Sequence, residues 1–357
     1  METPRLEIDL KKIYHNTKSI VNLFKAKNID VMGITKAVMG DPEIAKVMIN
    51  AGVSCIGDSR IENIERMKQA GVTAKLALIR TPLISKAEKV VLHADISLNS
   101  EVDVIRELSK YALKHSRTHK IILMIEMGDL REGIEIEEID QFICEVKALP
   151  KIKIVGLGTN LGCLNDVKPN SRKMAELSSI ASRLEKTHGI EFVIISGGNS
   201  SNFQWIMNAH DVYRINNLRI GELILLGTNP SSGSPVHFLK QDAFTLVTEV
   251  IESKKKKPYL EGVNTINSSG KAQEIGDELG YGSRTILGIG EQDTNIQGLR
   301  PLGNFTIVGS TSDHMIICNA SNNLRVGQEA RFTMSYEALT GAYTSPFVEK
   351  RIISYMI

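Results

Sequence analysis

The sequence predicts an α/β protein in which a (β/α)8 TIM barrel is followed by a mainly β C-terminal domain. Over the first two-thirds of the chain, short β-rich runs alternate with amphipathic helical stretches, as in a parallel barrel. A polar or glycine-rich segment follows each of these runs, and the helical periodicity ends near residue 235. We therefore expect a barrel domain over residues 1–232 and a β domain over residues 233–357.

The predicted barrel strands are eight short runs that are rich in Val, Ile and Leu. They are 31–35, 54–57, 75–79, 93–97, 120–126, 152–158, 191–196 and 217–220. Several of the helical stretches between them begin with a capping residue, such as Asp41 or Ser100. The predicted helices are 10–27, 42–51, 59–70, 85–91, 100–115, 136–148, 171–188 and 201–208.

The rest of the chain is typical of a β domain, because Val- and Ile-rich runs recur between Gly and Asn turns. The predicted strands are 243–252, 285–290, 304–309, 314–318 and 329–335, with at most one short helix among them. Four lysines stand at 254–257 without an aromatic residue or a second basic cluster nearby. We expect these lysines to form a solvated loop.

Composition and charge bound the class of function. The chain has 357 residues, of which 42% are hydrophobic and 24% charged, and its net charge of +2 predicts neither a nucleic-acid nor a membrane partner. It has no apolar run long enough to cross a bilayer, and its N-terminal segment is polar. Its four cysteines, which show neither disulfide nor metal-ligand spacing, are Cys55, Cys144, Cys163 and Cys318. We expect a cytoplasmic protein that binds small molecules and no metal.

Lys36 is the first candidate for chemistry, because it directly follows the first predicted barrel strand. A lysine at the carboxyl end of a barrel strand points into the mouth where active sites are built. In a desolvated site, lysine can form a Schiff base with a carbonyl compound. The alternative is a surface lysine that opens a loop.

A glycine-rich segment at 197–201 lies between the seventh predicted strand and the following helix. Its glycines permit close backbone approach, and the helix start offers free amides to an anion, although a plain turn with a serine cap is the alternative. Barrels often bind phosphate after strands seven and eight, where Gly221 can supply further amides. Together with Lys36, this segment predicts pyridoxal 5′-phosphate (PLP), which carries both an aldehyde and a phosphate.

Arg219 ends the eighth predicted strand, where it could face the pyridine nitrogen of PLP. An arginine keeps this nitrogen unprotonated and weakens the ring as an electron sink, which suits racemisation better than transamination. The alternative role for Arg219 is a structural salt bridge.

Nine segments of the chain, spread in order over nearly its whole length, carry a family resemblance. They are 4–9, 31–36, 57–63, 94–101, 127–133, 196–201, 217–222, 290–294 and 312–314. The chain resembles the alanine racemase group of fold-type III PLP-dependent enzymes, and within it most resembles the ornithine racemase branch.

The resemblance implies a set of site residues. Lys36 resembles the Schiff-base lysine, which is also one of two acid–base groups, and Arg131 resembles the arginine that holds the substrate carboxylate. Asn160 replaces the histidine that packs beside the cofactor ring in this family. The implied cofactor-binding residues are Lys36, Asn160, Ser200, Ser201, Arg219, Gly221 and Tyr343.

The second catalytic base is left open. In alanine racemases it is a tyrosine from the partner subunit's β domain, but the similar segment here, at 288–293, contains no tyrosine. The candidates are Asp293, Asp313 and His314, and we expect a homodimer whose sites are shared between subunits.

Acidic residues near the predicted mouth favour a substrate with a basic side chain, because a buried ammonium needs a carboxylate partner. They are Asp58, Asp129, Glu222, Asp293 and Asp313, of which Asp129 and Glu222 are assigned to substrate binding. Gly40, where the family has a tyrosine, is expected to leave room for a longer chain. The resemblance implies interconversion of L- and D-ornithine, and these residues agree with ornithine as well as with lysine or arginine; racemisation of lysine, arginine or alanine is the alternative.

Other classes of protein remain as alternatives to a racemase. A non-catalytic PLP-binding homeostasis protein would lack the C-terminal β domain, and a fold-type III decarboxylase would have a longer C-terminal region. A phosphate-sugar barrel enzyme without PLP would leave the β domain unexplained.

Overall fold

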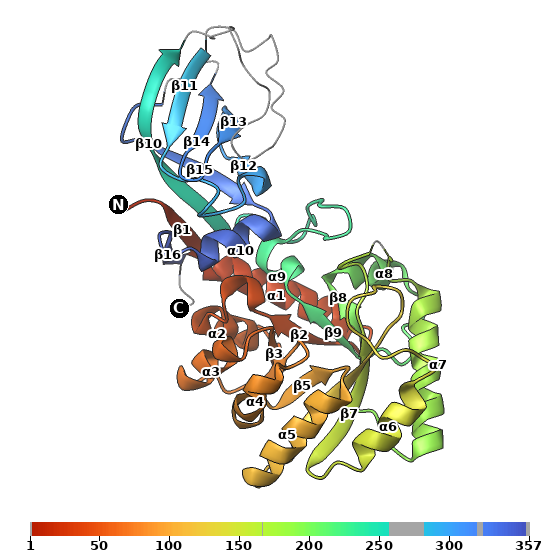
Figure 1. Cartoon of the computed structure of the whole chain (residues 1–357). Coiled ribbons are helices and arrows are strands. Elements are labelled where there is room, and N and C mark those ends of the chain that lie inside the picture. Colours follow the sequence, from red (N-terminus) through yellow and green to blue (C-terminus); the bar gives the residue numbers. More distant parts are fainter. Residues whose placement is uncertain (1, 166, 257–281, 320–323, 355–357) are drawn as a thin grey trace, which may run out of the picture. The chain divides into compact units, whose positions relative to one another are not determined.

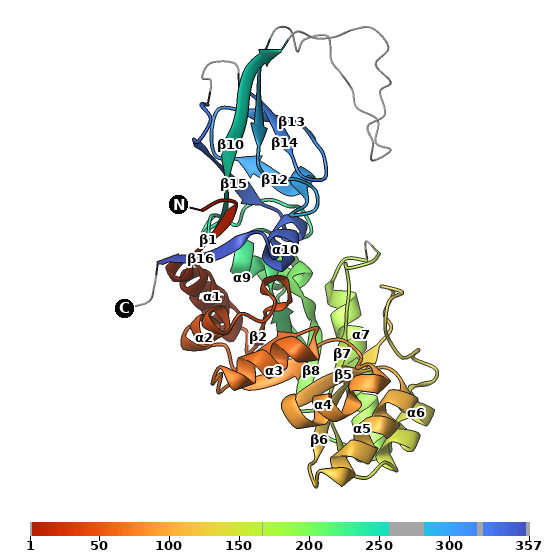
Figure 2. The same cartoon turned by 60° about the vertical axis from the view of Figure 1, so that its left-hand side comes forward.

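The computed structural model describes residues 2–165, 167–256, 282–319 and 324–354. Contacts divide the chain into two compact units. The first, which we call the barrel unit, is Lys11–Lys240, and the second, the β unit, combines Met1–Leu10 with Gln241–Ile357. Figures 1 and 2 show the elements of both units.

Eight parallel strands close the barrel in sequence order, which confirms the predicted fold class (Figure 1). They are β2 (Asp30–Ile34), β3 (Cys55–Asp58), β4 (Lys75–Leu78), β5 (Ile96–Asn99), β6 (His119–Ile125), β7 (Ile152–Thr159), β8 (Ile194–Asn199) and β9 (Asn217–Ile220). The pairing of β2 with both β3 and β9 closes the barrel, so the carboxyl ends of all eight strands meet at one rim.

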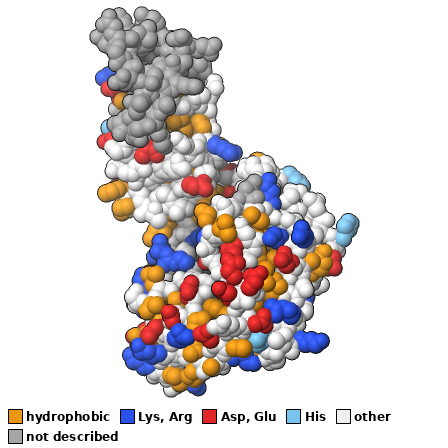
Figure 3. Space-filling model, turned by 45° about the vertical axis from the view of Figure 1, so that its right-hand side comes forward, with side chains coloured by type: hydrophobic (Ala, Val, Ile, Leu, Met, Phe, Trp, Pro, Cys, Tyr) orange, Lys and Arg blue, Asp and Glu red, His pale blue; other side chains and the backbone are white. Residues whose placement is uncertain are grey.

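Helices follow the strands and cover the outside of the barrel. They are α1 (Leu10–Lys25), α2 (Pro42–Asn50), α3 (Ile61–Gln69), α4 (Ala87–His93), α5 (Val102–Lys114), α6 (Ile139–Lys147), α7 (Ser171–His188), α8 (Phe203–Asn208) and α9 (Glu222–Leu226). Ion pairs such as Lys114–Glu88, at 2.7 Å, link neighbouring helices, and Figure 3 shows acidic and basic side chains interspersed on the surface. Within the described part of the chain, no helix is long and apolar enough to cross a membrane.

The barrel interior is filled by apolar side chains from neighbouring strands. The core cluster consists of Met32, Ile34, Cys55, Ala77, Ile96, Leu98, Ile122, Met124 and Val155. Gly57 on β3 is needed for this packing, because a Cβ there would lie 2.7 Å from the Ile34 side chain and 2.9 Å from the Met32 sulfur. The barrel is therefore a solid support, and chemistry is confined to its rim.

The β unit is built on one largely antiparallel sheet. Its strands are β1 (Arg5–Asp9), β10 (Phe244–Lys256), β11 (Gly282–Leu287), β12 (Leu299–Pro301), β13 (Thr306–Ser310), β14 (Met315–Asn319), β15 (Glu329–Met334) and β16 (Glu349–Ser354). The main path runs β12-β15-β10-β11-β14-β13, and β1 pairs with β10 and β16. Among the described residues of the β unit, the α-helix α10 (Tyr336–Thr344) is the short helical segment that the sequence allows.

The first ten residues group with the β unit, whereas the sequence analysis places them in a barrel domain over residues 1–232. The cause is long-range pairing: Arg5 lies opposite Val247 on β10 and opposite Glu349 on β16. The Arg5 guanidinium is buried and binds Glu329 at 2.6 Å and Glu7 at 2.8 Å. These bonds anchor β1 to the β unit.

Several predicted segments differ from the observed ones. The strand expected at 93–97 begins only at Ile96, because α4 continues to His93. The strand expected at 191–196 lies later, in β8, which extends to Asn199. The loop expected at 254–257 is wrong for 254–256, because these lysines continue β10 and pair with 282–284 of β11, while Lys257 lies outside the described residues.

Candidate active site

Lys36 lies at the carboxyl end of β2, where it begins a short 3-10 turn (Lys36–Val38). The turn closes through bonds from the Val38 and Gly40 amides to the Thr35 carbonyl oxygen, at 3.0 and 3.1 Å. The Lys36 side chain is exposed. A Schiff-base lysine is expected to be desolvated, whereas Lys36 is exposed in the single chain.

Asp58 is fully buried beneath this turn. It was predicted to be one of the acidic residues that face a basic substrate, but its carboxylate is not turned toward a ligand. Its carboxylate accepts bonds from the Thr35 hydroxyl and the Asn63 amide, both at 2.9 Å. Burial raises the pKa of Asp58 above its usual value, and these donors offset only part of the effect. Gly40 packs against the same group, because a Cβ on it would lie 2.6 Å from the Asn63 Cβ. The idea that Gly40 leaves room for a longer substrate is therefore wrong.

Arg219 lies at the centre of a hydrogen-bond network on the rim and is buried. It donates to the Ser196 hydroxyl at 2.5 Å, the Thr159 carbonyl at 2.7 Å and the Asn160 side-chain oxygen at 3.3 Å. Burial lowers the pKa of Arg219 to about 10. No carboxylate among the described residues forms an ion pair with it, so the structural salt-bridge alternative is wrong.

Asp129 anchors a loop of the barrel unit. Its Oδ1 atom accepts bonds from the backbone amides of Cys163, Leu164 and Asn165, at 3.0 to 3.4 Å. Asn160 lies 3.4 Å from the other carboxylate oxygen, and the Asn199 amide donates to Asn160 at 3.0 Å. The carboxylate that was predicted to bind substrate is thus already used by the loop after β7.

Arg131 forms an ion pair with the neighbouring Glu132. Burial tends to lower the pKa of Arg131, but the hydrogen bond to Glu132 and the nearby negative charges, that of Glu132 first, together outweigh burial, and the net shift is upward. The charges of Arg131 and Glu132 both act on the Arg219 guanidinium. The structure therefore brings Arg131 into the same region as Arg219 and Asn160.

The predicted phosphate segment joins the ends of β8 and β9. The Gly221 amide donates to the Ser200 hydroxyl at 3.2 Å, and the Ser201 amide donates to the Asn199 side chain at 2.7 Å. Gly198 has a φ of +139°, and a Cβ there would lie 2.2 Å from the Asn202 side-chain oxygen. A glycine is therefore required for this turn. Glu222, the first residue of α9, is half-buried and accepts a bond from Thr228 at 3.3 Å.

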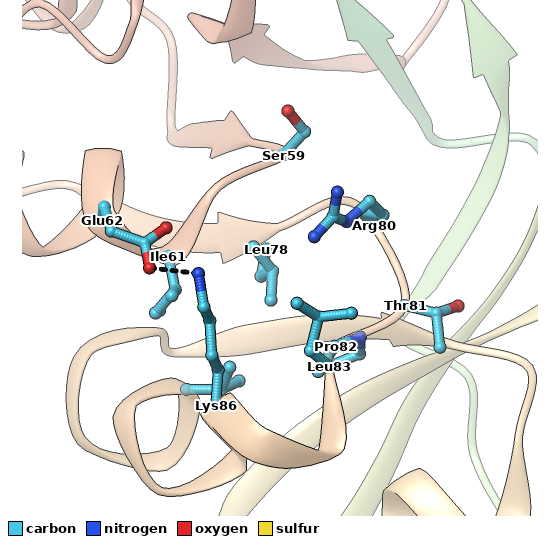
Figure 4. A pocket seen from close by; sticks show the side chains of 10 residues that line it. Ser59, Ile61, Glu62, Leu78, Arg80, Thr81, Pro82, Leu83 and Lys86 are labelled. Carbon is cyan, nitrogen blue, oxygen red and sulfur yellow. Dashed lines mark hydrogen bonds and ion pairs between the residues drawn. The ribbon is translucent and has the colours of Figure 1, made fainter.

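A small cavity lies at another part of the rim, between the segments that follow β3 and β4 (Figure 4). Its lining includes Ser59, Arg80 and Thr81, and the ion pair between Lys86 and Glu62, at 2.5 Å, crosses one side. None of the predicted site residues lines this cavity. We therefore build the candidate site on the Arg219 network and Lys36.

The remaining predicted residues belong to the β unit. Asp293 is buried and binds the Gly290 amide at 3.2 Å and the Ser345 hydroxyl at 3.1 Å. Asp313 and His314 belong to the turn between β13 and β14, where Asp313 Oδ1 lies 3.1 Å from His314 Nδ1. The hydrogen bond from the Thr311 hydroxyl and the charge of His314 lower the pKa of Asp313. Tyr343 is buried in α10, with the Lys350 ammonium 5.9 Å from its ring centre.

The Gly290 segment brings the three base candidates to one end of the β unit. The Glu291 amide donates to the Thr311 carbonyl and the Gln292 amide to the Ser312 carbonyl, both at 3.0 Å. A Cβ on Gly290 would lie 2.3 Å from the Ser312 carbonyl oxygen, so the two segments are in close contact. Sequence reasoning did not assign a role to Thr35, Asn63 or Asn199. The signals available in the sequence are that Thr35 directly precedes Lys36 and that Asn63 and Asn199 lie within the motifs at 57–63 and 196–201.

Comparisons with known proteins identify the family of the chain. The family model described as alanine racemase, N-terminal domain, matches residues 8–230. The lysine racemase of Thermotoga maritima is 36% identical over 352 residues, which cover 98% of each chain. The ornithine racemase of Acetoanaerobium sticklandii is 34% identical over 354 residues, covering 98% of this chain and 99% of that protein.

A solved alanine racemase, from the D-cycloserine-producing Streptomyces lavendulae, has the same fold, with a TM-score of 0.78 at 16% identity over 99% of each chain. The sequence matches extend through the β unit as well as the barrel. The resemblance stated from the sequence is thereby confirmed: this chain belongs to the alanine racemase family, and lysine and ornithine racemases are among its near full-length relatives.

Proposed function

We propose that this protein is a PLP-dependent amino-acid racemase that interconverts L- and D-ornithine, with lysine as the second candidate substrate. The observation that carries the proposal is the near full-length similarity to a lysine racemase and an ornithine racemase. Because the similarity includes the β unit, it favours an enzyme over a single-domain PLP-binding protein. The two relatives are about equally similar, which is why lysine stands beside ornithine.

The residues of the barrel rim fit PLP chemically. Arg219 is a buried cation whose hydrogen-bond partners in the described part of the chain are neutral, which suits an uncharged nitrogen acceptor such as that of a pyridine ring. Ser200 and the Gly221 amide lie together, as a phosphate-binding pair would. Lys36, Asn160, Ser201 and Tyr343 complete the proposed cofactor-binding set. PLP, when bound, supplies the conjugated aldehyde that makes the Cα hydrogen of an amino acid acidic.

The protein's own residues then bind the substrate and move its proton. Arg131 is proposed to hold the substrate carboxylate, which replaces or shares the contact with Glu132. Lys36 is proposed to exchange the Cα proton on one face. Glu222 is the better candidate for the distal ammonium group, because the Asp129 carboxylate is bonded to the loop after β7.

A second acid–base group is needed on the opposite face. We assign it to the Asp313–His314 pair of a second copy of the chain, in a homodimer, rather than to Asp293. The Asp313–His314 pair lies at an exposed turn, whereas Asp293 is buried and bonded to Gly290 and Ser345.

We also propose a cytoplasmic location, because the described cysteines are free.

The test is chiral product analysis of the purified, PLP-supplemented protein with L-ornithine, L-lysine, L-arginine and L-alanine. The proposal expects D-ornithine to form, with kcat/KM for ornithine or lysine well above that for alanine. A higher kcat/KM for lysine would move the assignment to lysine. No D-isomer from any of the four would overturn the proposed function.

A further inference from the structure

We propose that Thr35, Asp58 and Asn63 form a clamp that positions Lys36 for its reaction. We call residues 35–40 the lysine turn and these three residues the Asp58 clamp. The inference rests on the proposed function, because it concerns the lysine assigned to PLP. The three residues act through the turn and are positioning residues, not catalytic ones. The elements that carry them, β2, β3 and α3, are neighbours in the barrel unit (Figures 1 and 2).

The lysine turn needs support from outside itself. Two successive residues, Met39 and Gly40, have positive φ angles of +50° and +63°. Met39 is not a glycine, so this conformation carries a steric cost. Such a backbone persists only where the surrounding structure holds it in place.

The first end of the turn is held by Thr35, the residue directly before Lys36. Its hydroxyl donates to Asp58 Oδ2 at 2.9 Å, and its backbone amide donates to the Gly57 carbonyl at 3.0 Å. Thr35 and Asp58 are both fully buried. These bonds fix the backbone from which the Lys36 side chain begins.

The other end of the turn is held through Asn63. Its amide donates to Asp58 Oδ1 at 2.9 Å, and its Cβ lies where a Gly40 side chain would begin, 2.6 Å from the ideal Cβ position. Arg66 donates to the Asn63 oxygen at 3.0 Å, which fixes the orientation of the amide. One carboxylate therefore connects both ends of the lysine turn to α3.

The hydrogen bonds of the clamp favour an acceptor group at its centre. The three groups bonded to Asp58, which are the Thr35 hydroxyl, the Asn63 amide and the Arg60 backbone amide, all donate. An ionised aspartate can accept from all of them, whereas an asparagine would turn its NH2 group toward Thr35, whose hydroxyl would then have to accept instead of donate. The need for these bonds explains why a costly buried carboxylate is kept in this place.

The test compares Thr35→Val, which removes only the hydroxyl bond, with Thr35→Ser, which restores it. Hydrogen–deuterium exchange of the lysine turn is measured without PLP, and kcat and KM are measured with PLP. For Thr35→Val we expect exchange in the turn to rise about tenfold, with α7 unchanged. Its kcat should fall about 10- to 100-fold while KM changes less than about threefold. Thr35→Ser should behave like the wild type, and Asp58→Asn should behave like Thr35→Val.

Two results would overturn the inference. One is wild-type exchange and wild-type kcat in Thr35→Val; the other is an equal rise of exchange in the turn and in α7, which would mean a general folding role. If the wild type itself racemises nothing, the proposed function fails separately. The exchange data, which need no PLP, then still decide whether the clamp holds the turn.

Discussion

At the scale of single residues, the two arginines of the site, Arg131 and Arg219, have hydrogen-bond partners of different charge. Arg131 has a carboxylate partner in Glu132, whereas the partners of the buried Arg219 among the described residues are neutral. A buried cation without a counter-charge is costly, so it is expected where a ligand uses it. From the sequence, the position of Arg219 at a strand end could be predicted. Its bonds to Ser196 and Thr159 could not, because they join residues that are far apart in the chain.

The first prediction concerns Arg219→Lys, which keeps the charge but cannot reach three acceptors at once. We expect the free energy of unfolding to fall by about 1–3 kcal/mol, because buried acceptors lose their donors. The PLP dissociation constant should rise as well. Denaturant unfolding and PLP titration measure the two effects. The matched control is Arg214→Lys at the partly exposed ion pair with Glu185, for which we expect a change below about 1 kcal/mol and unaltered PLP binding.

At the scale of elements, glycines and loop anchors shape the rim. The sequence suggested that Gly40 provides space and that Asp129 binds substrate, but the structure gives both a part in local folding. Neither contact could be foreseen, since each depends on how a loop folds back onto a residue distant in sequence. The strand and helix alternation, by contrast, follows from local periodicity and could be predicted nearly throughout.

Gly40→Ala should destabilise the protein by roughly 2–4 kcal/mol, because the new Cβ meets Asn63 and the residue has a positive φ. Gly71→Ala is the control, since Gly71 has a similar φ of +76° but nothing within 4 Å of an added Cβ. That control should cost only about 1–2 kcal/mol. Denaturant unfolding measures the free energy of unfolding of both variants. An equal loss in Gly40→Ala and Gly71→Ala would mean that Asn63 shifts to make room for the new methyl group.

Asp129→Ala should lower the free energy of unfolding by about 1.5–3 kcal/mol, because backbone amides of the loop lose a charged acceptor. Asp129→Asn keeps one oxygen acceptor and should cost less. Denaturant unfolding and steady-state kinetics measure both variants. If stability stays at the wild-type value while KM for ornithine rises in both, the carboxylate binds substrate and the loop-anchor role is wrong.

At the scale of the whole molecule, contacts divide the chain into two compact units, the barrel unit and the β unit. The point that the sequence could not indicate is the grouping of the first ten residues with the β unit, because β1 pairs with strands more than two hundred residues away. Buried titratable groups also make the stability of the whole molecule depend on pH. His119 is such a group, since it is buried and its ring nitrogen lies 2.8 Å from the Ser97 hydroxyl.

Burial lowers the pKa of His119 to about 4 in the folded state. The unfolded chain, with an ordinary histidine pKa near 6.5, takes up the proton first as the pH falls. The contribution of neutral His119 to the free energy of unfolding is therefore complete above a pH of about 6.5, and it is lost as the pH falls from about 6.5 to about 4. Its size is on the order of 3 kcal/mol. As the pH is lowered through this range, the free energy of unfolding should fall less steeply for His119→Gln than for the wild type. His210→Gln, at an exposed histidine, is the control.

The role of Lys36 in racemisation is decided by the reaction of L-ornithine in D2O, with PLP present, catalysed by the wild type and by Lys36→Ala. Chiral separation followed by mass spectrometry shows both the configuration and the hydrogen at Cα. The account predicts D-ornithine carrying one deuterium at Cα from the wild type and none from Lys36→Ala, with L-lysine as the second substrate to try. Absence of D-product from both amino acids, or D-product formed equally well by Lys36→Ala, would contradict the account.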